Sequence, residues 1–432
     1  MDSLLLALLV PGLLFFIATS LILVHNHLHF LGLAGMHSDT DSKRSNGPKP
    51  PLDAGAPEPE PLVSILIPAR NEERNLPKLL ESLRRQDWPR MEIHVLDDHS
   101  EDQTRRIAEA FKKRVDEENK NRSGSSPATH HTAIGCEVFV HSSDEKPPGW
   151  LGKNWACYQL SEYANGDIFI FLDADTWLAP DAVSGILAAM EKFHLDFATV
   201  WPHQVMKTIA EKAVVSTVYS TVATYLPTKY SFRAPSWIPN RTLREKVKPL
   251  FANACGQCMI FTKETYRVTG GHQSVRNQVV EDVMLAKNVV KSGRTMRMFH
   301  GTDRLWCRMY SSSAELFQGF RKNFFAGFGY RYLPFLAAWL LHLVAYLLPV
   351  LILVAAISTP ETVPIANPVL GLSASMVAIA FLQRMWVAFF LKWPLSTAPL
   401  YLPGVLWFQV LAFVVLRDHF SNTRPTWKGR SV

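Results

Sequence analysis

Long apolar stretches lie toward both ends of the chain and frame a middle part of mixed composition. Leu4 to Val24 carries no charged side chain over about 21 residues, a length that crosses the hydrocarbon core of a bilayer. This stretch lacks the basic start and the small-residue cleavage site of a signal peptide, so we expect it to be retained. Three further apolar blocks are Leu333–Ile357, Val363–Leu382 and Pro399–Leu416. We predict a transmembrane anchor at residues 1–25 and two or three transmembrane segments at residues 333–417.

The regions beside the apolar stretches are polar or basic. Residues 26–61 are rich in Pro, Ser, Gly and charge, a composition that cannot bury a core, so we expect a flexible linker. Residues 418–432 are expected to form a basic tail. Basic side chains also gather beside the apolar stretches at Lys43, Arg44, Arg321, Lys322 and Arg331. Under the positive-inside rule they place the middle part in the cytosol and make the chain a multi-pass integral membrane protein.

The orientation of the last apolar segments stays open. Arg384 and Lys392 precede the last block, and Arg417 and Lys428 follow it. Both pairs favour the cytosol, although one full span separates them. Either the last block is re-entrant or the positive-inside rule fails there.

The middle part alternates between short apolar runs and amphipathic stretches. Strands are expected at Val63–Pro68, Met91–Asp97, Cys136–His141 and Ile168–Asp173. Helices are expected at Asn75–Gln86, Asp102–Val115, Asn154–Ala164 and Val283–Lys291. This alternation is typical of an α/β fold with a parallel sheet and right-handed crossovers.

Composition narrows the class of protein. The formal net charge is only +7, and we expect no nucleic-acid partner. The five cysteines show no disulfide framework, which fits a reducing compartment. Cys255 and Cys258 have the C-x-x-C spacing of a zinc half-site, but no second ligand pair of similar spacing is present. We therefore interpret them as core cysteines.

Charged residues follow three of the predicted strands. Arg70-Asn71-Glu72 follows the first strand, Asp97-Asp98 ends the second, and Asp173-Ala174-Asp175 ends the fourth. In α/β sheets, ligands bind outside the carboxyl ends of the strands. We therefore expect the three clusters to share one sheet edge and to bind a ligand. The local alternative for Asp175-Thr176 is the N-cap of a following apolar helix.

These residue types suit a nucleotide diphosphate. A Gly-rich dinucleotide motif and a P-loop lysine motif are both missing from the sequence, which argues against the usual dinucleotide redox chemistry and NTP hydrolysis. Asp97 and Asp98 can accept hydrogen bonds from a ribose or a base. Asp173 and Asp175 offer the hard oxygen ligands that Mg²⁺ or Mn²⁺ prefers, with positions left for phosphate oxygens.

Glu281 and Asp282 allow two interpretations. As acids in the first turn of a helix they are favoured by the helix dipole, by about 0.3–1 kcal/mol. Alternatively, they provide a general base that takes a proton from an acceptor hydroxyl. The residues alone do not decide between these interpretations.

Five motifs occur in the order seen in family 2 glycosyltransferases of GT-A fold, which the chain resembles from Val63 to Gly329. They are P-A-R-N-E-E from Pro68, D-D-H-S from Asp97, D-A-D from Asp173, E-D from Glu281 and Q-G-F-R-K from Gln318. Three other stretches resemble the membrane-bound subgroup associated with carotenoid and hopanoid glycosylation. These are P-P-G-W-L-G-K from Pro147, F-A-N-A-C-G-Q from Phe251 and R-M-Y-S-S from Arg308. The resemblance implies a GT-A catalytic domain at residues 62–310.

The resemblance also implies roles for the matched residues. The nucleotide-sugar donor would be held by Pro68, Arg70, Asn71, Glu72, Asp97, Asp98 and Ser100. Lys153 and Asp173 would lie near its phosphates, and Asp173 with Asp175 would hold the metal. Asp282 would be the catalytic base, with Glu281 beside it. Gln318 and Arg321 match the Q-x-x-R-W motif of processive synthases, in which Lys322 here replaces the tryptophan that stacks on the acceptor sugar.

We therefore expect an enzyme, an inverting glycosyltransferase that moves a single sugar to a lipid or isoprenoid acceptor at the cytosolic membrane face. Residues 311–332 carry phenylalanines at helical spacing beside basic residues, which predicts an amphipathic interfacial helix. One alternative is a processive polysaccharide synthase. The alternative from another class is a nucleotide-binding transporter or scaffold without catalysis. The sequence leaves the oligomeric state open.

Overall fold

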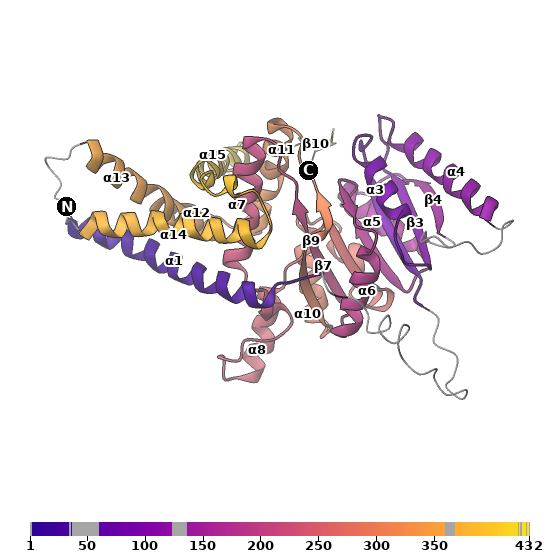
Figure 1. Ribbon diagram of the computed structural model, residues 1–432, viewed down its shortest axis with the longest axis horizontal. Coiled ribbons are helices and arrows are strands. Elements are labelled where there is room, and N and C mark those ends of the chain that lie inside the picture. Colours follow the sequence, from indigo (N-terminus) through magenta and orange to yellow (C-terminus); the bar gives the residue numbers. More distant parts are fainter. Residues whose placement is uncertain are drawn as a thin grey trace. The chain divides into compact units, whose positions relative to one another are not determined.

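The chain folds into two compact units. The computed structural model describes residues 2–33, 36, 60–122, 136–358, 368–421, 423, 426–428 and 430–431 (Figure 1). We call one unit the sheet unit, made of Phe30–Gln204 and Thr228–Arg308. The other is the helical unit, made of Met1–His29, Val205–Pro227 and Met309–Val432. The catalytic domain expected as an unbroken stretch at residues 62–310 is therefore interrupted, because Val205–Pro227 belongs to the helical unit.

The described residues of the sheet unit form a nine-stranded sheet. Its order is β1-β9-β7-β8-β5-β2-β3-β4, and β6 pairs with β9. The strands are β1 (Leu31–Gly32), β2 (Val63–Ala69), β3 (Met91–Asp97), β4 (Glu137–Ser142), β5 (Ile168–Leu172), β6 (Thr176–Leu178), β7 (Phe197–Gln204), β8 (Cys258–Thr262) and β9 (Met296–Cys307). Residues 26–33 of the expected linker thus continue helix α1 and form β1, whereas residues 34–35 and 37–59 lie outside the described part.

The sheet is mixed rather than parallel. Strands β2, β3, β4 and β5 pair in parallel, as the alternating pattern predicted. Strand β8 runs antiparallel to both β5 and β7, so the prediction of a parallel sheet is wrong for this half. An apolar run such as Met259–Phe261 specifies burial on both faces, and it carries no information about strand direction.

Helices cover both faces of the sheet. One core cluster joins the apolar sides of α3 (Leu76–Arg84), α4 (Thr104–Arg122) and α6 (Ala182–Lys192) to one face. Strand β5 contributes Ile170 and Leu172 to this cluster, and the alternate residues Phe169 and Phe171 are also buried. Side chains alternate along a strand, so β5 is covered on both faces up to its last residue, Leu172, and Asp173 follows directly. The other helices of this unit are α5 (Gly152–Tyr163), α8 (Arg241–Val247), α9 (Lys263–Val268) and α10 (Glu281–Lys291).

Asp175-Thr176 does not cap a helix. Thr176 begins strand β6, which pairs with β9, and α6 begins only at Ala182. The Thr176 hydroxyl and N–H both donate to the Asp173 carbonyl, at 2.7 and 3.1 Å. These bonds close a tight turn that holds Asp173 and Asp175 at the strand end, so the N-cap alternative is wrong.

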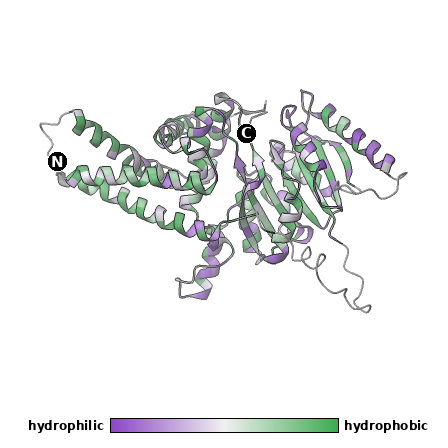
Figure 2. Cartoon of the chain, in the orientation of Figure 1, coloured by the Kyte–Doolittle hydropathy of each residue, from purple (hydrophilic) through white to green (hydrophobic). Residues whose placement is uncertain are grey.

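Among its described residues, the helical unit contains four helices that are long and apolar enough to cross a membrane. They are Ser3–His29, Tyr332–Ser358, Pro368–Phe390 and Tyr401–Phe420. The first corresponds to α1 (Asp2–His29), which continues four residues past the expected anchor. The second combines α12 (Tyr332–His342), a π-helical turn and α13 (Leu348–Ser358), and the others are α14 (Pro368–Phe390) and α15 (Tyr401–Phe420). Figure 2 shows the hydrophobic colour along α1 and α14.

Polar side chains bind a further helix, α7 (Ile209–Tyr225), into this unit. The Asn26 amide of α1 donates to the carbonyls of Ala223 and Leu226, at 2.8 and 2.7 Å. The buried Arg384 guanidinium of α14 donates to the Ser216 carbonyl at 2.9 Å. Hydrogen bonds of this kind are the means by which helices associate where the surroundings are apolar.

The segments on either side of the last spans are also helical. Residues 311–332, expected as one interfacial helix, contain α11 (Ser313–Phe324) and a 3₁₀ turn at Ala326–Phe328 before α12 begins. Of the expected basic tail, residues 418–420 close α15, and Thr426–Trp427 pairs with Arg430–Ser431.

Candidate functional site

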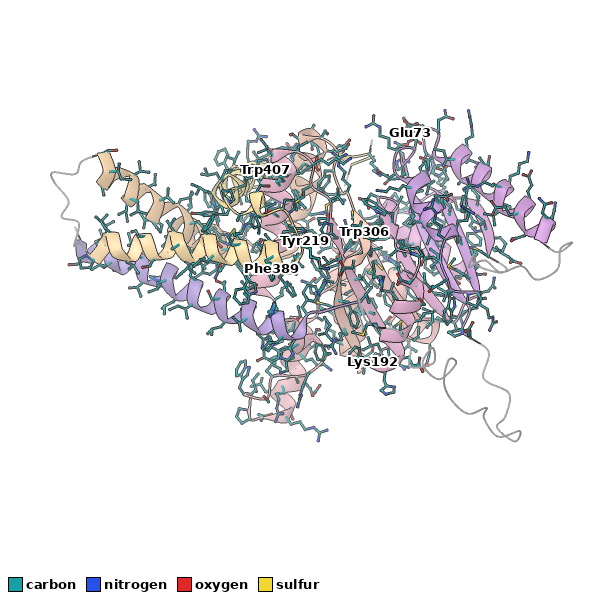
Figure 3. All side chains as sticks on the ribbon, viewed as in Figure 1. Glu73, Lys192, Tyr219, Trp306, Phe389 and Trp407 are labelled. Atoms are coloured by element: carbon teal, nitrogen blue, oxygen red, sulfur yellow. The ribbon has the colours of Figure 1, made fainter. Side chains whose placement is uncertain are left out.

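Two loops at the carboxyl ends of β2 and β3 are bonded to one another. The Arg70 guanidinium donates to the Asp98 carbonyl at 2.6 Å, and the Asn71 N–H donates to the Ser100 hydroxyl at 3.0 Å. Farther along, the Glu73 N–H donates to the Asp102 carboxylate at 3.1 Å, and Figure 3 labels Glu73. The predicted clusters around Arg70 and Asp97 therefore meet at one sheet edge.

Asp97 offers a carboxylate oxygen to a ligand. The side chain is buried, and its Oδ2 accepts only a long bond from the Ser100 N–H, at 3.4 Å. Its Oδ1 is buried without a hydrogen-bond partner among the described residues. A buried acceptor without a partner is costly, so this oxygen suits a ligand O–H or N–H.

Not every residue of these loops is equally open to a ligand. The Glu72 carbonyl accepts the N–H groups of Asn75 and Leu76, at 3.0 and 2.9 Å, and thereby starts α3. Its carboxylate accepts from the Asn75 amide at 2.8 Å. Pro68 lies within β2 opposite Leu96. Glu72 thus stabilises the loop and the start of α3.

A lysine and three acids form the centre of the site, and we call Lys153, Asp173, Glu281 and Asp282 the acid–lysine cluster. Lys153 lies in the first turn of α5, Asp173 follows β5, and the two acids begin α10. The Lys153 ammonium lies 2.8 Å from Asp173 Oδ1 and 3.1 Å from Glu281 Oε1. One cation thereby neutralises acids from two separate elements.

Asp282 is held by backbone N–H groups. Its Oδ2 accepts from the Gly256 N–H and its Oδ1 from the Val283 N–H, both at 2.8 Å. Burial raises the pKa of Asp282 to about 7, the Glu281 charge adds to the rise, and Lys153 opposes it. Such a carboxyl can exchange a proton near neutral pH, which is the property of a general base.

Lys153 remains charged within the cluster. Burial lowers the pKa of the Lys153 amine, but Asp173 and Glu281 together raise it well above its usual value. The Lys153 side chain is 37% exposed, so a ligand can reach the ammonium. A fixed positive charge in this position suits the phosphates of a nucleotide.

The two carboxylates Asp173 and Asp175 fit a divalent metal ion that also binds a ligand. Both are half-buried at the end of β5, and they supply the hard oxygen atoms that Mg²⁺ and Mn²⁺ prefer. Among the described residues, no group of three or more His, Cys, Asp or Glu is placed to hold a metal. The protein ligands alone are therefore too few for a closed site, and phosphate oxygens and water would have to complete it.

Two functional positions were not predicted. Gly256 supplies the N–H that holds Asp282, and a Cβ at this position would lie 3.3 Å from Asp282 Oδ2 and Lys153 Nζ. The Gln257 carbonyl accepts the Asp173 N–H at 3.2 Å, and its amide donates to Cys307 Sγ at 2.9 Å. Both residues lie in the F-A-N-A-C-G-Q stretch, which was noted as a motif without a role for its members.

The other predicted site residues belong to the other unit. Gln318 and Arg321 belong to α11 of the helical unit, where the Arg321 guanidinium donates to the Asp418 carboxylate of α15 at 2.5 Å. All five cysteines are free and buried. Cys255 and Cys258 are thus core residues joined by a tight turn, as the sequence predicted.

Part of the chain is similar to a family of known proteins. The model of the family described as "Glycosyl transferase family 2" matches residues 64–132 and 145–269. A 4,4'-diaponeurosporenoate glycosyltransferase from Staphylococcus haemolyticus (strain JCSC1435) is 28% identical over 269 residues, 61% of each chain. The enzyme of the same name from Staphylococcus aureus (strain USA300) is 26% identical over 270 residues, 62% of each chain. The chain thus spans less than two thirds of these curated relatives.

The solved structures that resemble this chain have lower sequence identity to it. A mannosyltransferase from Pyrobaculum calidifontis in complex with GDP-Man and Mn²⁺ is 13% identical with a TM-score of 0.47, covering 93% of this chain and 99% of that one. Glucosyl-3-phosphoglycerate synthase from Mycobacterium tuberculosis is 17% identical with a TM-score of 0.37, covering 62% and 79%.

The family match begins in β2 and ends directly after α9, so it contains Lys153, Asp173 and Gly256 and stops before Glu281. The mixed α/β sheet agrees with the GT-A fold that the five motifs implied. The resemblance drawn from those motifs is confirmed at this level: residues 64–132 and 145–269 match a glycosyl transferase family 2 domain.

Proposed function

We propose that this chain is a membrane-bound, inverting glycosyltransferase that moves a single sugar from a nucleotide-sugar donor to a lipid or isoprenoid acceptor at the cytosolic face. The observation that carries the proposal is the position of Asp282. Two N–H groups fix this carboxyl, its pKa is raised to about 7, and the acid–lysine cluster links it to the carboxylate that ends β5.

The donor would occupy the edge formed by β2, β3 and β5. Arg70, Asn71 and Ser100 line the two bonded loops, and the buried Asp97 Oδ1 offers an acceptor for a ribose or base. Pro68, Glu72 and Asp98 complete the nucleotide site implied by the motifs. Lys153 would bind an oxygen of the donor diphosphate and exchange part of its present contact with Asp173 for that bond.

Asp173 and Asp175 would hold a divalent ion, Mg²⁺ or Mn²⁺, which when bound supplies positive charge for the leaving diphosphate. The pair fits this task because it provides two carboxylates and leaves the remaining positions for phosphate. Lys153 lies 2.8 Å from Asp173 Oδ1 and adds a further positive charge beside the same phosphates.

Transfer would follow a single displacement. Asp282 takes the proton of the acceptor hydroxyl while the acceptor oxygen forms a bond to the anomeric carbon of the donor. The bond between that carbon and the diphosphate breaks at the same time, so the sugar is transferred with inverted configuration. Glu281 stays paired to Lys153, and its negative charge makes the neighbouring Asp282 a stronger base.

The acceptor is the least defined partner. The relatives are named for 4,4'-diaponeurosporenoate glycosylation, which supports an apolar, carotenoid-type acceptor. The four candidate membrane helices support an acceptor that resides in the bilayer. Lys322 stands where processive synthases carry a tryptophan, which supports transfer of one sugar rather than polymer synthesis. Gln318 and Arg321 enter the proposal through this motif alone, and Arg321 also pairs with Asp418.

Removal of the base or of a metal ligand should stop transfer. We expect Asp282→Asn to lower kcat by about 100-fold to 10,000-fold, the usual contribution of general base catalysis. Asp175→Ala should lower it at least ~100-fold, because charge stabilisation by a metal is worth several kcal/mol. The measurement is transfer of labelled sugar to extracted lipid by purified, reconstituted protein. Asp116→Asn in α4 is the control, since its carboxylate contacts only the side chain of Lys112. Full activity in both site variants would leave the nucleotide-binding scaffold as the better account.

The pH dependence should report the raised pKa of Asp282. Asp282 accepts a proton only when ionised, so kcat/KM should fall about tenfold for each pH unit below about 7 and level off above it. The profile of kcat/KM reflects the free enzyme, in which this pKa applies. About equal values of kcat/KM at pH 5.5 and pH 8 would contradict the assignment of Asp282 as the base.

A methyl group at Gly256 should disturb the site without unfolding the protein. In Gly256→Ala the Cβ would lie 3.3 Å from Asp282 Oδ2 and Lys153 Nζ, so both side chains must shift. Displacements of this kind cost about 10-fold to 100-fold in rate. Gly185→Ala within α6 is the matched control, because its Cβ would meet nothing closer than the Met36 carbonyl at 4.0 Å. Steady-state kinetics and thermal unfolding of both variants check this expectation, and equal kcat in the two would contradict it.

A further inference from the structure

A short surface segment of the sheet unit concentrates the positive charge of the chain. This segment, Thr228–Phe251, contains six Lys or Arg residues and one Glu, against a net charge of +7 for the whole chain. It includes α8 (Arg241–Val247) between the 3₁₀ turns Thr228–Ser231 and Lys248–Phe251. We propose that Thr228–Phe251, which we call the basic segment, docks onto anionic lipid headgroups and inserts apolar side chains beneath them.

Most of the positive charges of the basic segment have no neighbouring carboxylate within the described part of the chain. Within the described part of the chain, Arg233, Arg241, Lys246 and Lys248 have no carboxylate at ion-pair distance. Elsewhere in the sheet unit, exposed basic residues such as Arg105 and Lys113 pair with acids one helical turn away. The basic segment therefore presents a predominantly positive surface, which is the electrostatic feature that attracts anionic lipid.

Large apolar side chains project from the same segment. Trp237, Leu243 and Leu250 are 68%, 49% and 71% exposed. Helix α8 buries none of its residues, so packing against the rest of the protein does not explain its formation. A short helix with basic and apolar side chains on its surface gains from an environment that is charged above and apolar below, which a bilayer surface provides.

The basic segment is nevertheless an ordered part of the fold. The Asn240 side chain accepts the Leu243 N–H at 2.9 Å and caps α8. Ile238 is buried, and the rings of Tyr230 and Phe251 lie 5.2 Å apart. The Arg297 guanidinium of β9 lies 4.4 Å from the Phe232 ring centre. These contacts hold the two ends of the segment to the sheet unit and leave Trp237 and Leu243 at the surface.

Lipid is favoured over a protein partner by the position of the segment in the chain. It follows directly on α7, whose end is bonded to α1 through Asn26, and α1 is a candidate membrane span. Basic residues close to the ends of spans are those that the positive-inside rule counts. The basic segment therefore follows, in the sequence, a helix that is bonded to a candidate membrane span, and this favours lipid as its partner.

Docking of the basic segment would also affect the acid–lysine cluster. The turn Lys248–Phe251 lies against α10, which begins with Glu281 and Asp282. Five residues after Phe251, Gly256 holds Asp282 through its N–H. The basic segment is thus joined to the acceptor side of the cluster both by packing and by the chain. Docking itself does not depend on the proposed function, and its test requires no activity.

The experiment places a probe on the basic segment of the full chain in nanodiscs. Leu250→Cys is labelled with an environment-sensitive fluorophore, and the five native cysteines are buried and leave the label to the introduced thiol. Nanodiscs of phosphatidylcholine, with or without phosphatidylserine, also contain brominated lipid as a quencher. We expect a blue-shifted emission and strong quenching in the anionic nanodiscs. Val268→Cys, which is 61% exposed on α9, is the matched control and should stay in water.

Charge reversal separates electrostatic docking from other causes. Arg241→Glu, Lys246→Glu and Lys248→Glu combined should lower the quenched fraction at residue 250 at least ~5-fold, because each basic side chain near an anionic surface contributes about a factor of five. The control reverses three exposed lysines outside the segment, Lys120, Lys192 and Lys291, with the same change in net charge (Figure 3 labels Lys192). Quenching at residue 250 should survive in this control.

Three outcomes would overturn the proposal. The first is that the probe at residue 250 stays in water on anionic nanodiscs, which would favour a protein partner for the segment. Quenching is equal with and without phosphatidylserine. Quenching falls equally in both triple variants, which would show an effect of net charge rather than of this segment.

Discussion

The ion pairs of Lys153 are the constraint on which the site depends. They join the end of β5, the first turn of α5 and the start of α10, three elements that are distant in the sequence. Without this cation, Asp173, Glu281 and Asp282 would bring three like charges together in a partly buried place, at a high electrostatic cost. With it, Asp173 and Glu281 each have an opposite charge within 3.1 Å, and the pKa of Asp282, raised mainly by burial, is about 7.

The geometry divides the proposed reaction between the two sides of Lys153. In the proposal, Asp173 and Asp175 would bind the leaving diphosphate through a metal at the end of β5, where the tight turn through Thr176 holds them. Asp282 would act on the acceptor from the start of α10, where the N–H groups of Gly256 and Val283 hold its carboxylate. A Cβ at position 256 would lie 3.3 Å from both Asp282 Oδ2 and Lys153 Nζ, so these side chains would have to shift to accommodate it. Placement of the acids therefore follows from backbone contacts as well as from charge.

Local patterns predicted the elements that local forces determine. Strands β2, β3 and β5 are runs of apolar residues, and α3 buries its leucines at helical spacing, so both were expected near their observed bounds. The direction of β8 was not predictable, because a strand buried on both faces has the same apolar pattern whether its neighbours run parallel or antiparallel to it. The attachment of helix α7 to the helical unit was not predicted, since its Ser and Thr residues lower its hydropathy and its attachment depends on Asn26 and Arg384 far away in the sequence.

The site was predicted by residue type and strand position, but its internal contacts were not. Asp97, Asp173 and Asp282 were predicted as candidates because they end strands or begin a helix. The bridge from Lys153 to Glu281 joins residues that only the fold brings together, and the role of Gly256 is a backbone N–H that every residue type but proline carries. Sequence therefore indicated which groups take part, and the fold shows which of them act on one another.

The central claim, one displacement with Asp282 as base, is tested most directly by the stereochemistry of the product. A nucleotide-sugar with its diphosphate in the α configuration would be supplied to the reconstituted protein, and the anomeric coupling constant of the purified glycolipid would be measured by NMR. A single displacement predicts a β-linked product. An α-linked product would contradict the account, because retention requires a second displacement or attack from the side of the leaving group.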